Sequence, residues 1–342
     1  MHLNELTRTL IDIESITENE KAVGDFLYEY LRPLAARFGG ELERMEVEPG
    51  RFNVFACWGK PEIVLSTHMD TVPPFIRSRE DDEFIWGRGA CDAKGIAASM
   101  LHAAEALLAE GRRGLGVLFL VGEERNSAGA RAANRQPRGA RCLINGEPTE
   151  NKLALGSKGA LRLEVEAHGK MAHSAYAELG DSAILKLLDA LDALRHIEWP
   201  SDPVLGESTC NIGTISGGRA PNVVPDFARA EIMIRLVNNS GELCRKVIAA
   251  LGHRVETRVV LEVPPVRLGS VPGIETTVVK FTTDIPELTR WGQPFLLGPG
   301  TIHVAHTAEE RVPKRQLVEA VGLYQKIVKE LQDKPPNATR GA

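Results

Sequence analysis

Imidazole and carboxylate side chains stand at several points of the sequence where apolar runs end. His68 and Asp70 are two residues apart after the run 63–67, so on a strand both side chains would point to the same face. A metal-bound imidazole commonly needs a carboxylate on its other nitrogen, and Asp70 could supply it. Asp92 follows a glycine-containing turn, and its two oxygens could bridge two ions. Such ligands without cysteine suit zinc, with cobalt or manganese as substitutes.

Two more apolar runs end in carboxylates. Glu123 and Glu124 follow 116–121, which reads as a strand buried on both faces. Neighbouring side chains point in different directions, so one carboxylate could bind metal while the other faces a substrate. Glu147 follows the short run 141–145. Open α/β sheets collect their ligands at the carboxyl ends of strands, where these side chains are therefore expected.

A fifth segment, 298–310, lies far downstream and offers two histidines, His303 and His306. Any single segment is weak support for a metal site, because His-x-Asp and Glu-Glu pairs arise often by chance. An acidic surface face is the alternative interpretation. Five such segments, in this order and with their glycines and prolines, favour a metal site.

Strands and helices alternate around these segments and predict an α/β domain with a mostly parallel sheet. Helices are expected after the capping-box sequence Thr17–Glu20, at 93–108 and at 313–331. Strands are expected at 53–58, 63–67, 84–86, 116–121 and 141–145.

The pattern changes between residues 160 and 261, where strands alternate apolar and polar residues. The order strand-helix-strand-strand-helix-strand predicts an inserted ferredoxin-like (β-α-β-β-α-β) domain. We expect a catalytic domain of 1–156 and 268–342 and a lid or dimerisation domain of 157–267. The tail after Lys334 is expected to be loosely ordered.

Composition excludes several classes of protein. The 342 residues are 43% hydrophobic, which is enough for two domains, and the formal net charge is -5. This balance argues against nucleic-acid and membrane partners. There is no apolar run of 18 residues, and the N-terminus lacks the pattern of a signal peptide, so a cytoplasmic location is expected.

With these motifs, the sequence resembles the di-zinc amidohydrolase and metallopeptidase family. That family includes acetylornithine deacetylase, succinyl-diaminopimelate desuccinylase, aminoacylase and bacterial glutamate carboxypeptidase. The resemblance runs from His68 to Glu310, and segments 87–92 and 305–310 look closest to acetylornithine deacetylase. It favours His306 over His303, because the family has Ala-His-Thr followed by acidic residues. It implies two zinc ions, held by His68 and Glu147, by Glu124 and His306, and by Asp92 as the bridge.

The resemblance also implies the roles of other residues. Glu123 would be the general base, and Asp70 would orient His68. His173 would complete the active site, commonly that of a partner subunit, while Asn222 and Arg235 would contact the substrate. The alternatives from the residues alone are that His173 caps a turn and that Arg235 forms an ion pair at a strand edge.

The function so implied is hydrolysis of the amide bond of an N-acyl-L-amino acid by a hydroxide that bridges the zinc ions. Such a deacetylase would belong to amino-acid metabolism, as in arginine or lysine biosynthesis. A dipeptidase, a carboxypeptidase or an N-succinyl-amino-acid desuccinylase with the same metal core is the alternative. A non-catalytic metal or peptide binder is a third hypothesis, which the intact Glu123 disfavours. The expected partners are a small N-acyl amino acid or short peptide and, through the lid, a second copy of the chain.

Overall fold

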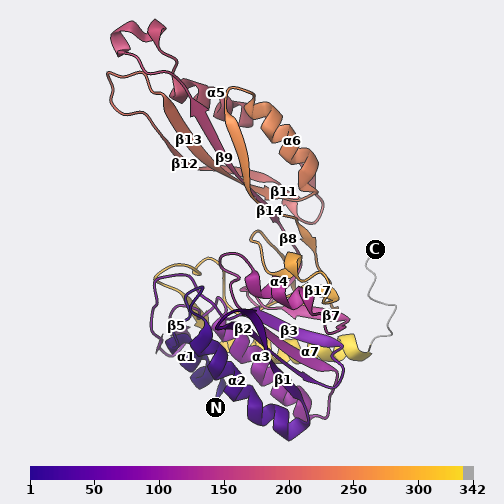
Figure 1. Cartoon of the computed structure of the whole chain (residues 1–342). Helices are drawn as coiled ribbons and strands as arrows, with labels where there is room; N and C mark the ends of the chain where they lie inside the picture. Colours follow the sequence, from indigo (N-terminus) through magenta and orange to yellow (C-terminus); the bar gives the residue numbers. More distant parts are fainter. Residues whose placement is uncertain (334–342) are drawn as a thin grey trace. The chain divides into compact units, whose positions relative to one another are not determined.

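The computed structural model describes residues 1–333, and this part of the chain forms two compact units (Figure 1). The first unit comprises Met1–Leu155, Arg267–Thr277 and the chain from Thr283 onward, and the second comprises Gly156–Val266 and Val278–Thr282. The short segment 278–282 joins the second unit because Lys158 and Ser157 donate hydrogen bonds to its backbone. The tail after Lys334 lies outside the described residues.

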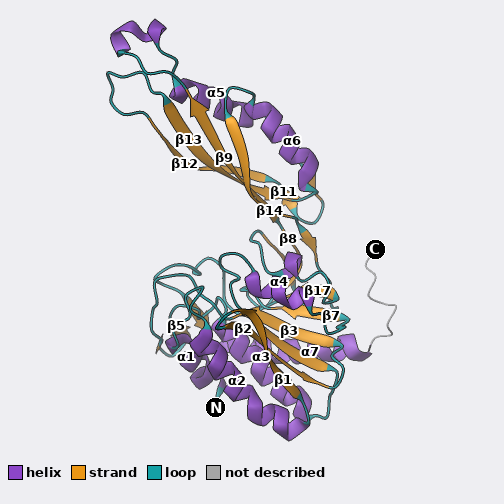
Figure 2. Ribbon diagram, viewed as in Figure 1, coloured by secondary structure: helices purple, strands orange, loops and turns teal. Residues whose placement is uncertain are grey.

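A six-stranded sheet with the order β1-β2-β6-β3-β7-β17 forms the centre of the first unit (Figure 2). Strand β3 pairs in parallel with β6 and β7, and β17 pairs in parallel with β7, whereas β2 is antiparallel to both of its neighbours. The expected α/β fold with a mostly parallel sheet is confirmed. The strands are β1 (Glu41–Glu48), β2 (Arg51–Trp58), β3 (Ile63–His68), β6 (Leu115–Leu120), β7 (Cys142–Asn145) and β17 (Gln293–Leu296).

Apolar side chains cover both faces of this sheet. Leu65 and Val117 belong to a core that contains residues of the four helices α1, α2, α3 and α7, whereas Val64 and Leu118 belong to a core with α4 and Trp291. Strand β6 is therefore buried on both faces, as its apolar run predicts. The helices are α1 (Leu3–Asp12), α2 (Lys21–Phe38), α3 (Lys94–Ala109), α4 (Ala128–Arg135) and α7 (Lys314–Asp333).

The capping box expected at Thr17–Glu20 is wrong. Helix α2 begins at Lys21, and no side chain caps its first turn. The Thr17 hydroxyl instead donates to Asp70 at 2.8 Å, and the Glu20 carboxylate accepts hydrogen bonds from Arg51. Both side chains therefore bind partners outside the helix and leave its first turn without a side-chain cap.

The second unit has an antiparallel sheet of order β12-β13-β9-β14, with α5 and α6 packed on one face. This order is that of the predicted ferredoxin-like domain. Residues of β13 alternate between the buried face and an open face, which carries Arg229, Glu231, Met233 and Arg235. The elements are β9 (Gly159–His168), α5 (Ala183–Leu194), β12 (Thr209–Gly217), β13 (Phe227–Leu236), α6 (Ser240–Leu251) and β14 (Glu256–Val263).

Short elements complete the described chain. They are β4 (Arg79–Glu80), β5 (Phe84–Trp86), β8 (Leu153–Ser157), η1 (Ser174–Leu179), β10 (Ser201–Asp202), β11 (Gly206–Glu207), β15 (Val266–Arg267), β16 (Thr276–Val279), η2 (Ile285–Glu287) and β18 (Arg311–Pro313). Across residues 1–333, no helix is long and apolar enough to cross a membrane.

Candidate metal centre

Four neighbouring parallel strands, β6, β3, β7 and β17, direct their carboxyl ends to one edge of the first unit's sheet. His68 is the last residue of β3, and its Nδ1 lies 3.0 Å from the Asp70 carbonyl oxygen and 3.5 Å from Asp70 Oδ1. This contact directs Nε2 toward Asp92. Burial alone would lower the pKa of His68, but its hydrogen bonds to Asp70 and Asp92 outweigh burial and hold that pKa well above its usual value.

Asp70 is fully buried and joins three segments of the chain. Its carboxylate accepts the Thr17 hydroxyl at 2.8 Å and the backbone N–H groups of Glu123 at 3.1 Å and Glu124 at 3.2 Å. The chain turns at Gly122, whose φ of 79° is in the left-handed region, directly before these two N–H groups. Burial opposes ionisation, yet the hydrogen bonds from His68 and Thr17 keep the pKa of Asp70 below its usual value.

Asp92 lies between two imidazoles just before α3. Its Oδ1 is 3.0 Å from His68 Nε2, and its Oδ2 is 3.2 Å from His306 Nε2. Burial opposes its charge, but the hydrogen bonds from His306 and His68 hold the pKa of Asp92 below its usual value. One carboxylate thus presents one oxygen to each of two histidines, which is the geometry of a bridging ligand.

His306 brings the downstream segment to the same place. Its Nε2 lies 3.1 Å from Oε1 and 3.0 Å from Oε2 of Glu124. Hydrogen bonds to Asp92 and Glu124 raise the pKa of His306 to about 10. The alternative histidine, His303, is exposed, and in the described chain the hydrogen bond found for it is from its backbone N–H to Thr301.

Glu147 and Glu123 complete the set of carboxylates. Glu147 is buried after β7, and its Oε1 has no hydrogen-bond partner among residues 1–333. Burial, and then the charge of Glu147, raise the pKa of the half-buried Glu123 well above its usual value. Burial likewise raises the pKa of Glu147, with further contributions from Asp92 and Asp284. The edge therefore concentrates negative charge that bound cations would stabilise.

These residues fit a metal centre. Ligand atoms of His68, Asp92 and Glu124 lie within 4.8 Å of one another. The donors are imidazole nitrogens and carboxylate oxygens, which suit zinc and its usual substitutes. The unpartnered oxygen of Glu147 is a buried acceptor that a cation would satisfy, since a buried polar atom without a partner is costly.

Asp284 belongs to the same environment and is absent from the sequence-based prediction. It directly precedes η2, and its side chain is 1% exposed. Burial raises the pKa of its carboxyl to about 7. Its charge acts on both Glu123 and Glu147. No ligand-like spacing precedes or follows it, so the sequence gives no signal for its position.

The three residues expected to contact substrate lie in the second unit. His173 and Asn222 are exposed and adjacent: the Ser174 N–H donates to the Asn222 carbonyl at 3.0 Å, and His173 forms an isolated β-bridge with Val223. Arg235 stands near the end of β13, and within residues 1–333 its guanidinium has no ion-pair partner. Partial burial lowers the pKa of Arg235.

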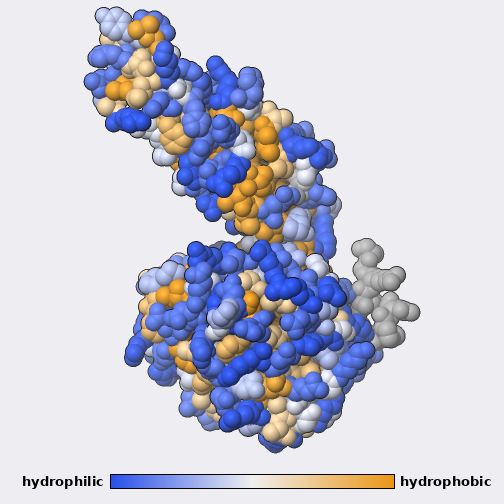
Figure 3. Space-filling view, viewed as in Figure 1, coloured by the Kyte–Doolittle hydropathy of each residue, from blue (hydrophilic) through white to orange (hydrophobic). Residues whose placement is uncertain are grey.

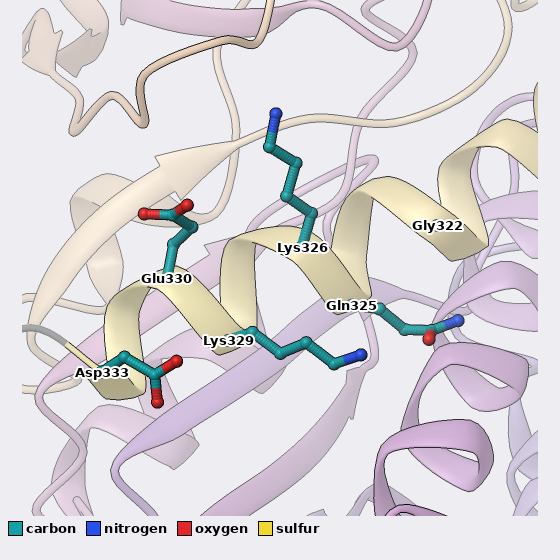
Figure 4. Close-up of a pocket in the computed structure, with 6 residues that line it drawn as sticks. All are labelled: Gly322, Gln325, Lys326, Lys329, Glu330 and Asp333. Atoms are coloured by element: carbon teal, nitrogen blue, oxygen red, sulfur yellow. The ribbon is translucent and has the colours of Figure 1, made fainter.

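A hollow of about 480 Å³ along α7 does not belong to this centre (Figure 4). Three of its four charged side chains already have partners elsewhere. Lys326 donates to the Gly273 carbonyl, Lys329 pairs with Glu110, and Asp333 pairs with Arg112. We therefore assign it no ligand.

Comparison with known proteins places most of the chain in one protein family. Residues 64–330 match the family described as peptidase family M20/M25/M40. A peptidase M20 domain-containing protein of Schizosaccharomyces pombe is 39% identical over an alignment of 339 positions, which covers 96% of this chain and 84% of that protein. A probable carboxypeptidase of Aspergillus clavatus is 40% identical and covers 94% of this chain and 80% of its own length.

Solved structures share the fold at lower identity. Aminopeptidase PepT from Bacillus cereus aligns with a TM-score of 0.80 at 21% identity, over 97% of this chain and 98% of its own. A dinuclear metal-binding peptidase from Bacillus subtilis aligns with a TM-score of 0.69 at 16% identity, over 97% of this chain and 98% of its own. The names of the sequence relatives leave the expected acetylornithine deacetylase branch without support.

Replacing the two downstream histidines one at a time tests the centre. We expect His306→Ala to lower the zinc content from about two equivalents per chain to about one, because it would remove a predicted ligand of a two-metal site. His303→Ala is the matched control and should retain both equivalents. Metal analysis of the dialysed proteins measures this, and loss of zinc in the His303 variant alone would reverse the assignment.

Proposed function

Because the chain belongs to peptidase family M20/M25/M40, we propose that it is a dinuclear zinc exopeptidase that releases a C-terminal amino acid from short peptides or N-acyl amino acids. Membership makes the chain a metal-dependent hydrolase of amide bonds. The observation that carries the proposal is Asp92, whose two oxygens face two different imidazoles. The dinuclear metal binding named for the Bacillus subtilis neighbour agrees with it.

The proposed ligand sets follow from the contacts around Asp92. Glu124, His306 and Asp92 would hold one ion, since His306 Nε2 approaches both carboxylates within 3.2 Å. His68 and Asp92, which are 3.0 Å apart, would hold the other ion, and Glu147, whose buried Oε1 has no partner in the described chain, would supply a further ligand. Zinc is the proposed metal, and cobalt or manganese can replace it.

When bound, two such ions polarise the amide carbonyl and lower the pKa of water. Glu123 is the proposed general base. Its carboxylate accepts a proton from the attacking water and returns it to the nitrogen of the leaving amine. The backbone N–H groups of Glu123 and Glu124 both donate to Asp70, so Asp70 fixes the base and one ligand while it orients His68.

The guanidinium of Arg235, unpaired within residues 1–333, favours a substrate with a free carboxylate. In the described chain it lacks an ion pair, whereas Arg229 on the same face of β13 pairs with Glu164 and Glu231. A guanidinium held without a partner suits the carboxylate of a C-terminal residue. Carboxypeptidase and deacylase activity cut the same bond, in front of that residue. The name of the Aspergillus clavatus relative favours the carboxypeptidase, and an acetylornithine-type deacetylase is the second candidate.

We also propose that two copies of the chain share each active site. His173 and Asn222 lie beyond the Phe227 end of β13, and Arg235 lies eight residues along that strand, about 26 Å away at about 3.3 Å per residue. One small substrate cannot contact both ends of one sheet, so the three residues serve it together only if two chains contribute.

Exposed apolar side chains on the second unit support such an assembly. Among the described residues, all the exposed large hydrophobic side chains except Met1 and Val318 belong to this unit. Ile212 and Ile215 lie on β12, which is an edge strand of the sheet. Figure 3 shows apolar surface on this unit. Apolar surface of this kind at a sheet edge is typical of an interface between chains.

Glu123→Gln separates catalysis from metal binding. The amide keeps the size of the side chain but cannot accept the proton, so we expect kcat to fall by about 10²–10⁴ with both ions retained. Steady-state kinetics and metal analysis on one preparation measure this. Loss of an ion would instead make Glu123 a ligand and overturn the assignment of Glu124.

Substrate choice is tested with four compounds that share one leaving residue: an N-acetyl amino acid, an N-succinyl amino acid, an N-blocked dipeptide and its C-terminal amide. We expect the blocked dipeptide to be cleaved and its amide to resist. Arg235→Ala should lower kcat/KM for the free acid about 10- to 100-fold, the usual value of a charged hydrogen bond. Arg229→Ala is the control and should have little effect. Equal cleavage of acid and amide would contradict the carboxylate requirement.

Mixing two inactive variants tests the shared site. Both His173→Ala and Glu123→Gln homodimers should have low activity. After subunit exchange, the heterodimer contains one intact site, so partial recovery is expected. Sedimentation equilibrium establishes the dimer, and full activity of a chain that is monomeric at the assay concentration would exclude sharing.

A further inference from the structure

Glu310 is a buried carboxylate outside the proposed ligand sets, and its side chain contacts the backbone that carries Asp92. We propose that Glu310, held by Arg88, is a positioning residue that fixes Asp92 and His306 relative to each other. The inference rests on the proposed function, in which Asp92 and His306 bind the same ion. Neither Glu310 nor Arg88 is a proposed metal ligand, so positioning Asp92 and His306 is a role distinct from binding metal.

One oxygen of Glu310 accepts hydrogen bonds from the turn that leads into Asp92. Its Oε1 accepts backbone N–H groups from Gly89 at 2.9 Å, Asp92 at 3.2 Å and Cys91 at 3.3 Å. Three N–H groups on one oxygen fold residues 89–92 around the carboxylate as a nest. The backbone of Asp92 therefore cannot shift without breaking a contact to Glu310.

The second oxygen of Glu310 is held by Arg88. Arg88 Nη1 donates to Oε2 at 2.6 Å, and Arg88 Nε donates to the Pro74 carbonyl at 3.3 Å. The two side chains are 2% and 1% exposed. A buried ion pair contributes little net stability, because desolvation offsets the attraction. The pair is better explained by its geometry, because Arg88 holds Oε2 of Glu310 while Oε1 accepts the backbone N–H groups.

Glu310 also belongs to the segment that carries His306. The Gly87 N–H donates to the Glu310 carbonyl at 3.0 Å, and the next residues form β18, which pairs with β5. The Asp92 segment and the His306 segment are thus joined by backbone and side-chain bonds of a single residue. His306 Nε2 reaches Asp92 Oδ2 at 3.2 Å within this frame.

The test compares two buried carboxylates that pair with arginine. Glu310→Gln keeps the shape of the side chain but removes its charge and replaces one acceptor oxygen with a donor. Glu20→Gln is the matched control, because Glu20 is buried and accepts Arg51 Nε at 3.0 Å and Nη2 at 2.7 Å without contacting a proposed ligand. For each protein, zinc dissociation constants are measured by chelator competition, the visible spectrum after cobalt substitution is recorded, and Tm is determined.

We expect Glu310→Gln to weaken one of the two zinc sites about 10- to 100-fold, as is usual for residues that orient metal ligands, and to change the cobalt spectrum. Glu20→Gln should lower Tm and leave both dissociation constants and the spectrum as in the wild type. If the Glu310 variant does not fold, Arg88→Lys serves instead. It retains the charge but not the guanidinium geometry, and a weaker zinc site with a changed cobalt spectrum is again expected.

Two results would overturn the inference. Unchanged zinc affinities and an unchanged cobalt spectrum in the folded variant, with a lower Tm alone, would make Glu310 a purely structural residue. The proposed function would be unaffected by that result. A wild-type protein that binds fewer than two ions would overturn the proposed function and this inference together.

Discussion

Carboxylates placed close together repel one another, and the first unit holds a group of buried and half-buried ones at one edge of its sheet. Asp70, Asp92, Glu123, Glu124 and Glu147 converge there, with two imidazoles as the cationic groups between them. The surrounding structure resists this repulsion through hydrogen bonds. Thr17 and two backbone N–H groups hold Asp70, while Glu310 holds the turn of Asp92. The edge is therefore organised in advance for cations, which would replace repulsion between the carboxylates with attraction.

Much of this arrangement could be predicted from the sequence, because most of its proposed ligands follow apolar runs. His68, Glu123, Glu124 and Glu147 stand at the ends of β3, β6 and β7, whose apolar patterns identify them as buried strands. The ferredoxin-like insert was predictable for a similar reason, since its strands alternate between a buried and an open face. In both cases the spacing of apolar residues along a strand shows whether one or both faces of that strand are buried.

Other features depend on contacts between distant residues. Four glutamates occupy β1, so its composition does not resemble a strand, and Pro294 interrupts the short β17. Thr17 has the spacing of a helix cap, yet its hydroxyl bonds to Asp70, 53 residues away. Asp284 and Glu310 are buried carboxylates whose charged neighbours, Glu147 and Arg88, are far along the chain. Such positions are set by tertiary packing, which no short window of sequence contains.

The order of the ligands along the chain has a consequence for biosynthesis. His68, Asp92, Glu124 and Glu147 all precede the second unit, and His306 follows it. A nascent chain that has exposed its first 155 residues already carries one proposed ligand set, His68, Asp92 and Glu147, while Glu124 still lacks its histidine. Strand β7 also remains an open sheet edge until β17 is synthesised. The second proposed ligand set would therefore be completed only after the inserted domain has been translated.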